Sequence, residues 1–340
     1  MIGATTVDEN EDPASPLLAT GRGSLEELPG LIDSLGVRKS LLVVGPGVTP
    51  TAERVRSLLG GRCTGTFTDA VAHVPSWEAN LAVASAQEVH ADSVIAIGGG
   101  SAAGYAKIVA LALRLPRVAV PTTLSGAELT SRYFVTTEKG KESGNSERAA
   151  VRAVVRDPDL LTDVPVLVLA SSGMGAVGAC VEVLARPGEA GRVDATEGLR
   201  LLWEALPRLV REPADPGLRE RALAGAALAG AALEAAGPGP AQLVAEDLGA
   251  THHADHGALM ACLVPHVGLE VELVRELAGP GSAADALRWF AAAIRLPVDL
   301  GAVCPPLDPD AVVARLAERP DLADRADPDS MLMLLKEALR

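Results

Sequence analysis

The sequence is poor in aromatic residues, in cysteine and in basic charge, and each shortage excludes a class of protein. Aromatic residues make up 2% of the 340 positions while 48% are hydrophobic, so the core must consist mainly of aliphatic side chains. The four cysteines are far apart and include no Cys-x-x-Cys pair. This spacing indicates neither a zinc knuckle nor a disulfide framework and favours reduced, mostly buried thiols.

Basic residues are outnumbered, with 30 Lys and Arg against 44 Asp and Glu and a formal net charge of -14. An acidic protein is a poor partner for nucleic acid or for an anionic membrane. The sequence shows no apolar run that approaches the length of a membrane-spanning helix, and residues 1–16 are acidic where a signal peptide would be basic and then apolar. We therefore expect a cytoplasmic protein with a disordered tail at 1–16 that acts on a small molecule.

Strand and helix patterns alternate along the first half of the chain. Short apolar strands are predicted at 41–44, 63–68, 93–97 and 117–120, with helices at 24–36, 50–59, 76–90 and 102–113. Strands separated by helices of this size indicate a parallel, doubly wound sheet. A stretch rich in Glu, Lys, Gly and Asn at 138–147 is typical of a hairpin tip.

Helical patterns dominate the second half of the chain, where Pro and Gly clusters separate them. We expect the boundary near residue 160, and 340 residues are enough for two domains that each bury a core. The predicted fold is an α/β Rossmann-like N-terminal domain at 17–160 followed by an all-α C-terminal domain at 161–340.

A glycine-rich turn follows the strand predicted at 93–97 and leads into a helix. It consists of Gly98, Gly99, Gly100 and Ser101. Backbone N–H groups at a helix start bind anions, and glycine lets the backbone approach a phosphate closely. Taken alone, such a turn is as often a plain tight turn. The next strand ends in Thr122 and Thr123, at the edge of a parallel sheet where ligands bind, which favours a phosphate site.

Several longer blocks occur in a fixed order. They include GRGSLEELPGLIDSLG (21–36), LLVVGPG (41–47), IGGGSAAGYAKIVAL (97–111), PTTLSGAELT (121–130), SSGMGAVGACVEVLA (171–185) and LGATHHADHGALMACLVPHV (248–267). Over roughly residues 17–280 the chain resembles the iron-type alcohol dehydrogenases, most closely their maleylacetate reductase branch. That family belongs to the dehydroquinate synthase-like superfamily, and the resemblance implies its fold.

The resemblance also implies a dinucleotide site. The glycine turn would hold the pyrophosphate of NAD(P), with Thr122 and Thr123 near the ribose and nicotinamide. Pro46 stands where relatives that prefer NAD often carry an acidic residue, so either NADPH or NADH is expected. Lys107 follows the Ala-Lys pattern of the family, but a solvated helix face explains it equally well.

Of the four metal ligands usual in the family, the resemblance implies that only His256 is retained. By the resemblance, Gly175 and Ala179 stand at the Asp and first His positions, and Gln242 precedes His256 by fourteen residues, where another His is usual. Glu246 replaces an additional His. One imidazole and an amide cannot hold a catalytic metal, so we expect none. A relocated metal site formed by His252, His253, Asp255, His256 and Glu246 is the weaker alternative.

These substitutions leave two interpretations of the activity. The first is a metal-independent NAD(P)H-dependent reductase of a small carbonyl or enone, in which His256 donates the proton and Glu246 and His252 assist. Gln242 and Arg148 would bind a carboxylated substrate, unless Arg148 simply lies on the surface. The second is a non-redox lyase, dehydratase or cyclase of a specialised pathway, with Glu246 and His256 as acid and base. A non-catalytic homologue is the third, and the family suggests a homodimer.

Overall fold

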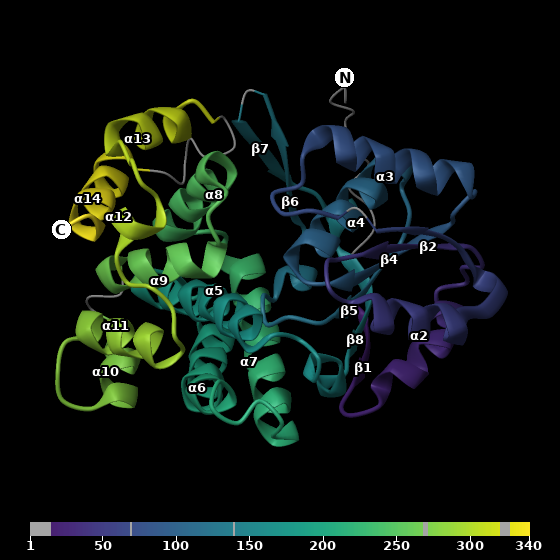
Figure 1. The fold of residues 1–340 in the computed structure, drawn as a ribbon, viewed down its shortest axis with the longest axis horizontal. Coiled ribbons are helices and arrows are strands. Elements are labelled where there is room, and N and C mark those ends of the chain that lie inside the picture. The colour runs from purple at the N-terminus through teal and green to yellow at the C-terminus, as the bar shows by residue number, and fades with distance from the viewer. Residues whose placement is uncertain (1–14, 69, 139, 268–270, 320–326) are drawn as a thin grey trace.

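The computed structural model describes residues 15–340 except 69, 139, 268–270 and 320–326. The tail expected at 1–16 therefore lies almost wholly outside the described residues. Figure 1 shows two lobes side by side, one built around a sheet and the other made of helices. The predicted combination of an α/β domain and a helical domain is confirmed.

The sheet of the first lobe has six parallel strands in the order β1-β8-β5-β4-β2-β3. Four of them match the expected positions: β2 (Ser40–Val44), β3 (Cys63–Phe67), β4 (Ser93–Gly98) and β5 (Arg117–Pro121). Two strands were not expected from the sequence, β1 (Leu17–Thr20) and β8 (Val151–Arg156), which pair with each other at one side of the sheet. All six strands run in one direction, so their carboxyl ends meet at one edge.

Helices cover both faces of this sheet. On one face, an apolar cluster joins the strands to α1 (Leu28–Ser34) and α2 (Thr49–Leu59). On the other face, a second cluster joins them to α3 (Ser76–Glu88) and α4 (Gly100–Leu113). The helix expected at 24–36 is instead a 3-10 turn, η1 (Ser24–Glu27), followed by α1, because Pro29 lacks the N–H group that a continuous helix needs.

A two-stranded antiparallel hairpin leaves the first lobe between β5 and β8. It consists of β6 (Arg132–Thr137) and β7 (Gly140–Asn145), as the composition at 138–147 predicted. Short 3-10 turns flank it, η3 (Ala127–Leu129) before and η4 (Glu147–Ala149) after. Strand β7 packs against α8 of the helical lobe, so the hairpin spans the space between the lobes (Figure 1).

The second lobe is helical throughout its described residues. Its elements are α5 (Val166–Ala185), α6 (Arg192–Leu209), α7 (Pro216–Ala236), α8 (Pro240–His252), α9 (His256–Val267), α10 (Glu272–Ala278), α11 (Ala283–Ala293), α12 (Leu300–Val303), α13 (Pro309–Ala317) and α14 (Pro328–Ala338). Helix α5 packs against α6, α7 and α9 at the centre of one large core. Small residues permit close approach of α6 and α7, since a Cβ on Gly198 would lie 3.1 Å from the Gly225 carbonyl oxygen.

Helix α5 corrects one expectation from the sequence. By length and composition it could cross a membrane, and it is the one single helix among the described residues with that property. Of its most apolar window, 72% is buried inside the protein. The apolar character of α5 therefore reflects its position as the core helix of the second lobe.

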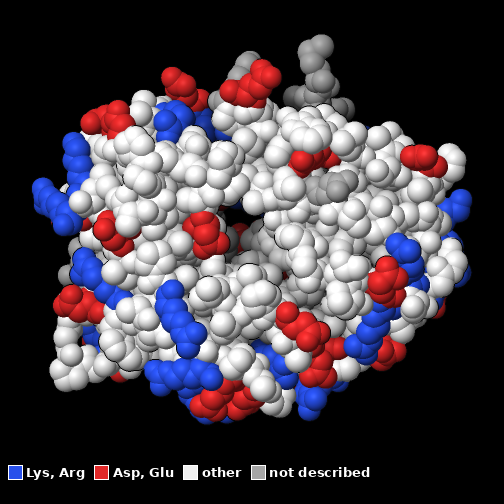
Figure 2. Space-filling model, viewed as in Figure 1, with Lys and Arg blue, Asp and Glu red and all other residues white. Residues whose placement is uncertain are grey.

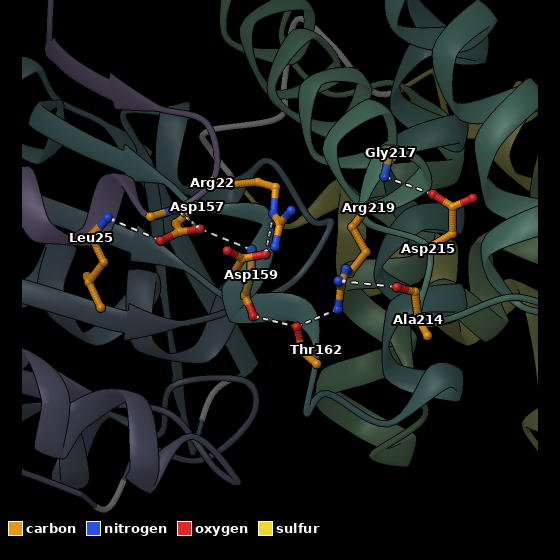
Figure 3. Close-up of polar contacts among 10 residues, drawn as sticks. Arg22, Leu25, Asp157, Asp159, Thr162, Ala214, Asp215, Gly217 and Arg219 are labelled. Atoms are coloured by element: carbon orange, nitrogen blue, oxygen red, sulfur yellow. Dashed lines mark hydrogen bonds and ion pairs between the residues drawn. The ribbon is translucent and has the colours of Figure 1, made fainter.

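The chain passes between the lobes through η5 (Pro158–Leu161), and polar contacts tie this junction to both sides (Figure 3). The buried Asp157 carboxylate accepts hydrogen bonds from the backbone N–H groups of Gly23, at 3.1 Å, and Leu25, at 3.2 Å. On the helical side, the Arg219 guanidinium donates to the Thr162 hydroxyl. The domain boundary expected near residue 160 falls within η5 and stays a prediction.

Candidate functional site

A cavity of about 1280 Å³ lies between the two lobes. Figure 2 shows a hollow at the centre of the molecule, where the lobes meet. The volume exceeds the roughly 300–1,000 Å³ of ordinary small-molecule sites, so the cavity is large enough for an extended ligand together with a second small one. Its wall combines the carboxyl edge of the sheet, the β6–β7 hairpin and the helices α5, α8 and α9.

The glycine turn forms one end of the cavity. Gly99, Gly100 and Ser101 line the cavity, and Gly98 lies directly beneath them at the end of β4. Gly98 has a φ of 140°, a conformation that other residues rarely adopt, and a Cβ there would lie 3.2 Å from the Gly45 Cα. Helix α4 begins at Gly100, so its first residues line the cavity, and the N-terminus of a helix is an arrangement that binds a phosphate.

Two threonines at the end of β5 stand beside this turn. Thr122 is 1% exposed and lines the cavity, and its hydroxyl oxygen has no hydrogen-bond partner among the residues that the structure describes. A buried hydroxyl without a partner is costly, so this atom fits a ligand that supplies one. Thr123 and Pro46 also line the cavity. The residues expected to hold a dinucleotide are thus brought together at one end and fit that group.

The opposite wall contains the positions where relatives were expected to carry metal ligands. Gly175 and Ala179 from α5, Gln242 and Glu246 from α8, and His256 at the start of α9 all line it. A Cβ on Gly175 would lie 3.4 Å from the His256 Cδ2, so the two residues face each other as the sequence match implied. Gln242 and Glu246 share a helix face through their i, i+4 spacing.

This wall does not fit a catalytic metal ion. Gly175 and Ala179 offer no ligand atom, and Gln242 offers an uncharged amide. The Glu246 carboxylate forms an ion pair with Arg132 of β6. In the part of the chain that the structure describes, no three His, Cys, Asp or Glu side chains gather to hold a metal. His256 is therefore left without the partners that a bound metal requires.

Of the alternative cluster, His253, Asp255, His256 and Glu246 line the cavity and His252 does not, and among the described residues they form no group able to hold a metal. The His252 ring lies 2.9 Å from the Thr251 hydroxyl and 3.3 Å from the Pro306 carbonyl oxygen, and the side chain does not line the cavity. Asp255 instead caps α9, accepting from the Ala258 N–H at 2.8 Å. The structure thus corrects the placement of His252 in the site, because α8 continues through His252 and turns only at His253, whose φ is 54°.

Burial shifts the titration of His73 and His256, which both line the cavity. Desolvation lowers the pKa of His256, with the Glu246 charge opposing it only in part. Desolvation, aided by the Lys141 charge, lowers the pKa of His73 to about 4. Both rings are consequently neutral near pH 7 and can each donate one N–H hydrogen bond.

Arg148, expected to bind a carboxylate, is exposed in η4 and does not line the cavity. Lys107 of α4 and Arg295 after α11 line it instead, together with two cations of the hairpin. Arg132 and Lys141 both line it, and the Arg132 Nη2 also donates to the Ser143 hydroxyl at 2.9 Å. Burial opposes the charge on Glu246, but the charges of Arg132 and Lys141 outweigh it and lower the pKa of Glu246 to about 2.

Lys107 is a further correction, because it is not on a solvated face. It is 4% exposed, and its Nζ donates to the Thr130 hydroxyl at 2.7 Å and to the Arg132 carbonyl oxygen at 2.8 Å. The helix-face interpretation failed because the hairpin covers this side of α4. Arg132 and Phe134 are two positions apart, as are Lys141 and Ser143, and residues with this spacing lie on the same face of a strand. This spacing was the one sequence signal that could have indicated the role of the hairpin.

The fold and the cavity define a two-domain dehydrogenase scaffold, and comparisons place it more closely. The chain belongs to the iron-containing alcohol dehydrogenase family. The model described as iron-containing alcohol dehydrogenase matches residues 16–158, and that of the C-terminal region of the Fe-containing family matches residues 169–276.

Among individual relatives, the chain is similar to maleylacetate reductases. That of Burkholderia cepacia is 34% identical over 312 residues, which cover 89% of each chain. Maleylacetate reductase 1 of Cupriavidus pinatubonensis is 32% identical and covers 86% of this chain and 85% of its own. The crystal structure of maleylacetate reductase from Rhizobium sp. strain MTP-10005 matches with a TM-score of 0.84, 30% identity and 96% coverage of both chains.

Proposed function

We propose that this protein is a metal-independent, NAD(P)H-dependent reductase of the maleylacetate reductase type, acting on a small carbonyl or enone substrate. The family and the similarity to maleylacetate reductases support the reaction class. The observation that carries the proposal is the single cavity, which joins the glycine turn to the wall around His256.

Each end of the cavity has a distinct role in this proposal. Gly99, Gly100 and Ser101 hold the pyrophosphate through backbone N–H groups, and the unpartnered hydroxyl of Thr122 bonds to the cofactor. A bound reduced nicotinamide supplies the hydride. His256, neutral near pH 7, has no second proton to release and instead orients the substrate through one ring N–H.

The absence of metal ligands is the second part of the proposal. In metal-dependent enzymes the metal ion polarises the carbonyl group of the substrate. The side chains at positions 175, 179 and 242 are Gly, Ala and Gln, and they cannot do this. Hydrogen-bond donors and fixed charges must replace it, and the cavity wall offers Arg132 and Lys141. Activated carbonyls and conjugated double bonds need the least help of this kind.

The non-redox alternative is less well supported by the geometry. It requires Glu246 and His256 to act as an acid and a base. An ion-paired carboxylate with a pKa of about 2 holds no proton at neutral pH, and its Oε1 is engaged by Arg132. Glu246 is therefore an anchor for Arg132 in this proposal rather than a proton donor.

The remaining expectations concern partners and location. A small-molecule substrate, the absence of nucleic acid and membrane partners, a homodimer and a cytoplasmic location all stay predictions. Size-exclusion chromatography with light scattering tests the dimer, with a mass near twice the 34.8 kDa of the chain as the expected result.

Titration calorimetry with NADPH and NADH, followed by an absorbance assay at the nicotinamide band, tests the proposed function. We expect binding of at least one dinucleotide and its oxidation by maleylacetate or by another oxo acid or enone in a panel. Binding without oxidation by any of these substrates would contradict the reductase. Failure to bind either dinucleotide would favour the lyase or cyclase interpretation.

A further inference from the structure

The β6–β7 hairpin presents one face that gathers cationic side chains. Its antiparallel register pairs Phe134 with Ser143 and Thr136 with Lys141. Because paired and alternate residues point to the same side of a hairpin, Arg132, Phe134, Lys141 and Ser143 share this face. Strand β7 packs against α8, whose Glu246 receives the Arg132 guanidinium. The hairpin thus carries its cations to the wall where relatives were expected to hold a metal.

Lys141 is held there against an aromatic ring of the same hairpin. The residue is 8% exposed and lines the cavity. Its Nζ lies 3.6 Å from the centroid of the Phe134 ring, a cation–π contact. Within the described residues, no acceptor lies within hydrogen-bonding distance of that Nζ. A buried ammonium group offers three N–H donors, so this one is able to receive an oxygen atom of a ligand.

The surroundings of Lys141 carry an excess of positive charge. Arg132 pairs with Glu246, and the Arg319 Nη2 donates to the Ser143 hydroxyl at 2.6 Å. The nearby Asp247 is engaged by Arg315, with a closest approach of 2.6 Å. Among the described residues that line the cavity, Lys107, Arg132, Lys141 and Arg295 outnumber Glu234, Glu246 and Asp255, in a chain of net charge -14. Such a balance favours a ligand that carries or develops negative charge.

We infer that Lys141 takes the place of a metal ion in the reaction, binding the carbonyl oxygen of the substrate through Nζ and giving it a proton. This inference rests on the proposed function. In a simple carbonyl the carbonyl carbon gains the hydride and the electron pair of the broken π bond moves to the oxygen. In an enone the β carbon gains the hydride, the π electrons shift through the conjugated system to the same oxygen, and the enol that forms tautomerises to the ketone. In both cases one proton leaves Nζ for that oxygen. The resulting neutral amine regains a proton from water. Arg132 is a positioning residue that anchors the hairpin to Glu246 and adds positive charge.

Titration of Lys141 agrees with this role. Burial lowers the pKa of Lys141 to about 8, with Glu246 raising it and Arg132 and Arg319 lowering it. The charged or titratable groups around it are Glu246 and Asp247 on α8, Arg132 on β6, Arg319 after α13, and His73 and His256 across the cavity. A proton donor works best when its pKa lies near the working pH. Below pH 8 Lys141 holds the proton, and above it the proton is lost.

The test compares Lys141→Met, Lys141→Arg and Lys336→Met, the last an exposed control on α14. In calorimetry of the NADP⁺ complex, the probe is oxamate, an unreactive amide with a carbonyl oxygen and a carboxylate. We expect Lys141→Met to weaken oxamate binding about 10-fold or more, since hydrogen bonds to charged groups are strong. NADPH affinity should stay within about 3-fold, and the Lys336→Met variant should match the unaltered protein.

Kinetics supply the second readout. We expect kcat to fall about 100-fold or more in Lys141→Met, as for loss of a proton donor. Lys141→Arg keeps the charge but cannot release a proton, so the decline of kcat above pH 8 should disappear along with most of the activity. The inference would be overturned if Lys141→Met bound oxamate as tightly as the unaltered protein, or if the unaltered protein did not bind oxamate. A variant that lost only NADPH affinity would overturn it as well. If no substrate oxidises NADPH, the proposed function fails, while the oxamate measurement still decides the role of Lys141.

Discussion

At the scale of single residues, the glycine turn tolerates a methyl group at one position and not at its neighbour. A Cβ on Gly99 would lie 2.6 Å from the Thr123 hydroxyl oxygen, whereas a Cβ on Gly100 would meet nothing within 4 Å. Gly99→Ala should therefore lower the free energy of unfolding by about 1–3 kcal/mol through overpacking. Gly100→Ala is the matched control and should leave it nearly unchanged. Urea unfolding of the two variants compares them, and equal stabilities would contradict the packing described here.

The family resemblance was enough to place some site residues but not others. It implied that Glu246 and His256 lie in the cleft between the domains, and both line the cavity together with Gln242. His252 was misplaced because its position depends on where α8 ends, and the sequence does not show the turn at His253. Lys141 was missed because its partners depend on the hairpin register, which requires the pairing of both strands to be known.

At the scale of elements, α8 owes its placement to a buried carboxylate from α5. Glu182 is 1% exposed, and it accepts hydrogen bonds from the Ala241 N–H at 2.6 Å and the Gln242 N–H at 3.1 Å. Burial raises the pKa of Glu182 from 4.5 to about 7, and these backbone donors oppose the rise only in part. The carboxyl group therefore stabilises the start of the helix that carries Gln242 and Glu246.

The raised pKa of Glu182 predicts the direction in which the stability of the protein changes with pH. Between about pH 4.5 and pH 7 the folded protein holds a proton on Glu182 that the unfolded chain has lost, so this residue makes stability fall as pH rises. The full effect is about 3 kcal/mol. The Glu182→Gln side chain cannot ionise. The free energy of unfolding of this variant minus that of the unaltered protein should therefore be larger at pH 8 than at pH 4.5.

Urea unfolding at several pH values measures this difference, with Glu53→Gln, an exposed site on α2, as the control. The control should show no comparable change between the two pH values. A Glu182→Gln variant whose relative stability does not depend on pH would show that the carboxyl group titrates normally.

Elements with strong local signals were predicted well, and those set by tertiary context were not. The apolar strands β2, β4 and β5 were found because central parallel strands are continuous hydrophobic runs. Strand β1 has four residues, of which only Ala19 is buried, so no pattern marks it. Helix α5 carried no special signal in the sequence. Its composition matches a membrane span because a helical core and a lipid bilayer both favour apolar residues.

At the scale of the whole molecule, the cavity between the lobes joins the glycine turn at one end to the wall around His256 at the other. Its two ends come from separate lobes, so the chemistry depends on the junction at 157–162 as well as on the site itself (Figure 3). The sequence match anticipated this arrangement because the blocks of both lobes follow the order found in the family. It could not supply the charge of the wall, which arises from contacts between α8 and the hairpin.

Hydride transfer by metal-free protein tests the central claim most directly. Protein treated with a strong chelator, and checked by elemental analysis for iron and zinc, is incubated with NADPH deuterated at C4 and with maleylacetate or the best substrate of the panel. We expect one deuterium atom in the product by mass spectrometry, at a rate equal to that of untreated protein. Loss of deuterium transfer after chelation, with recovery on adding Fe²⁺ or Zn²⁺, would contradict the account.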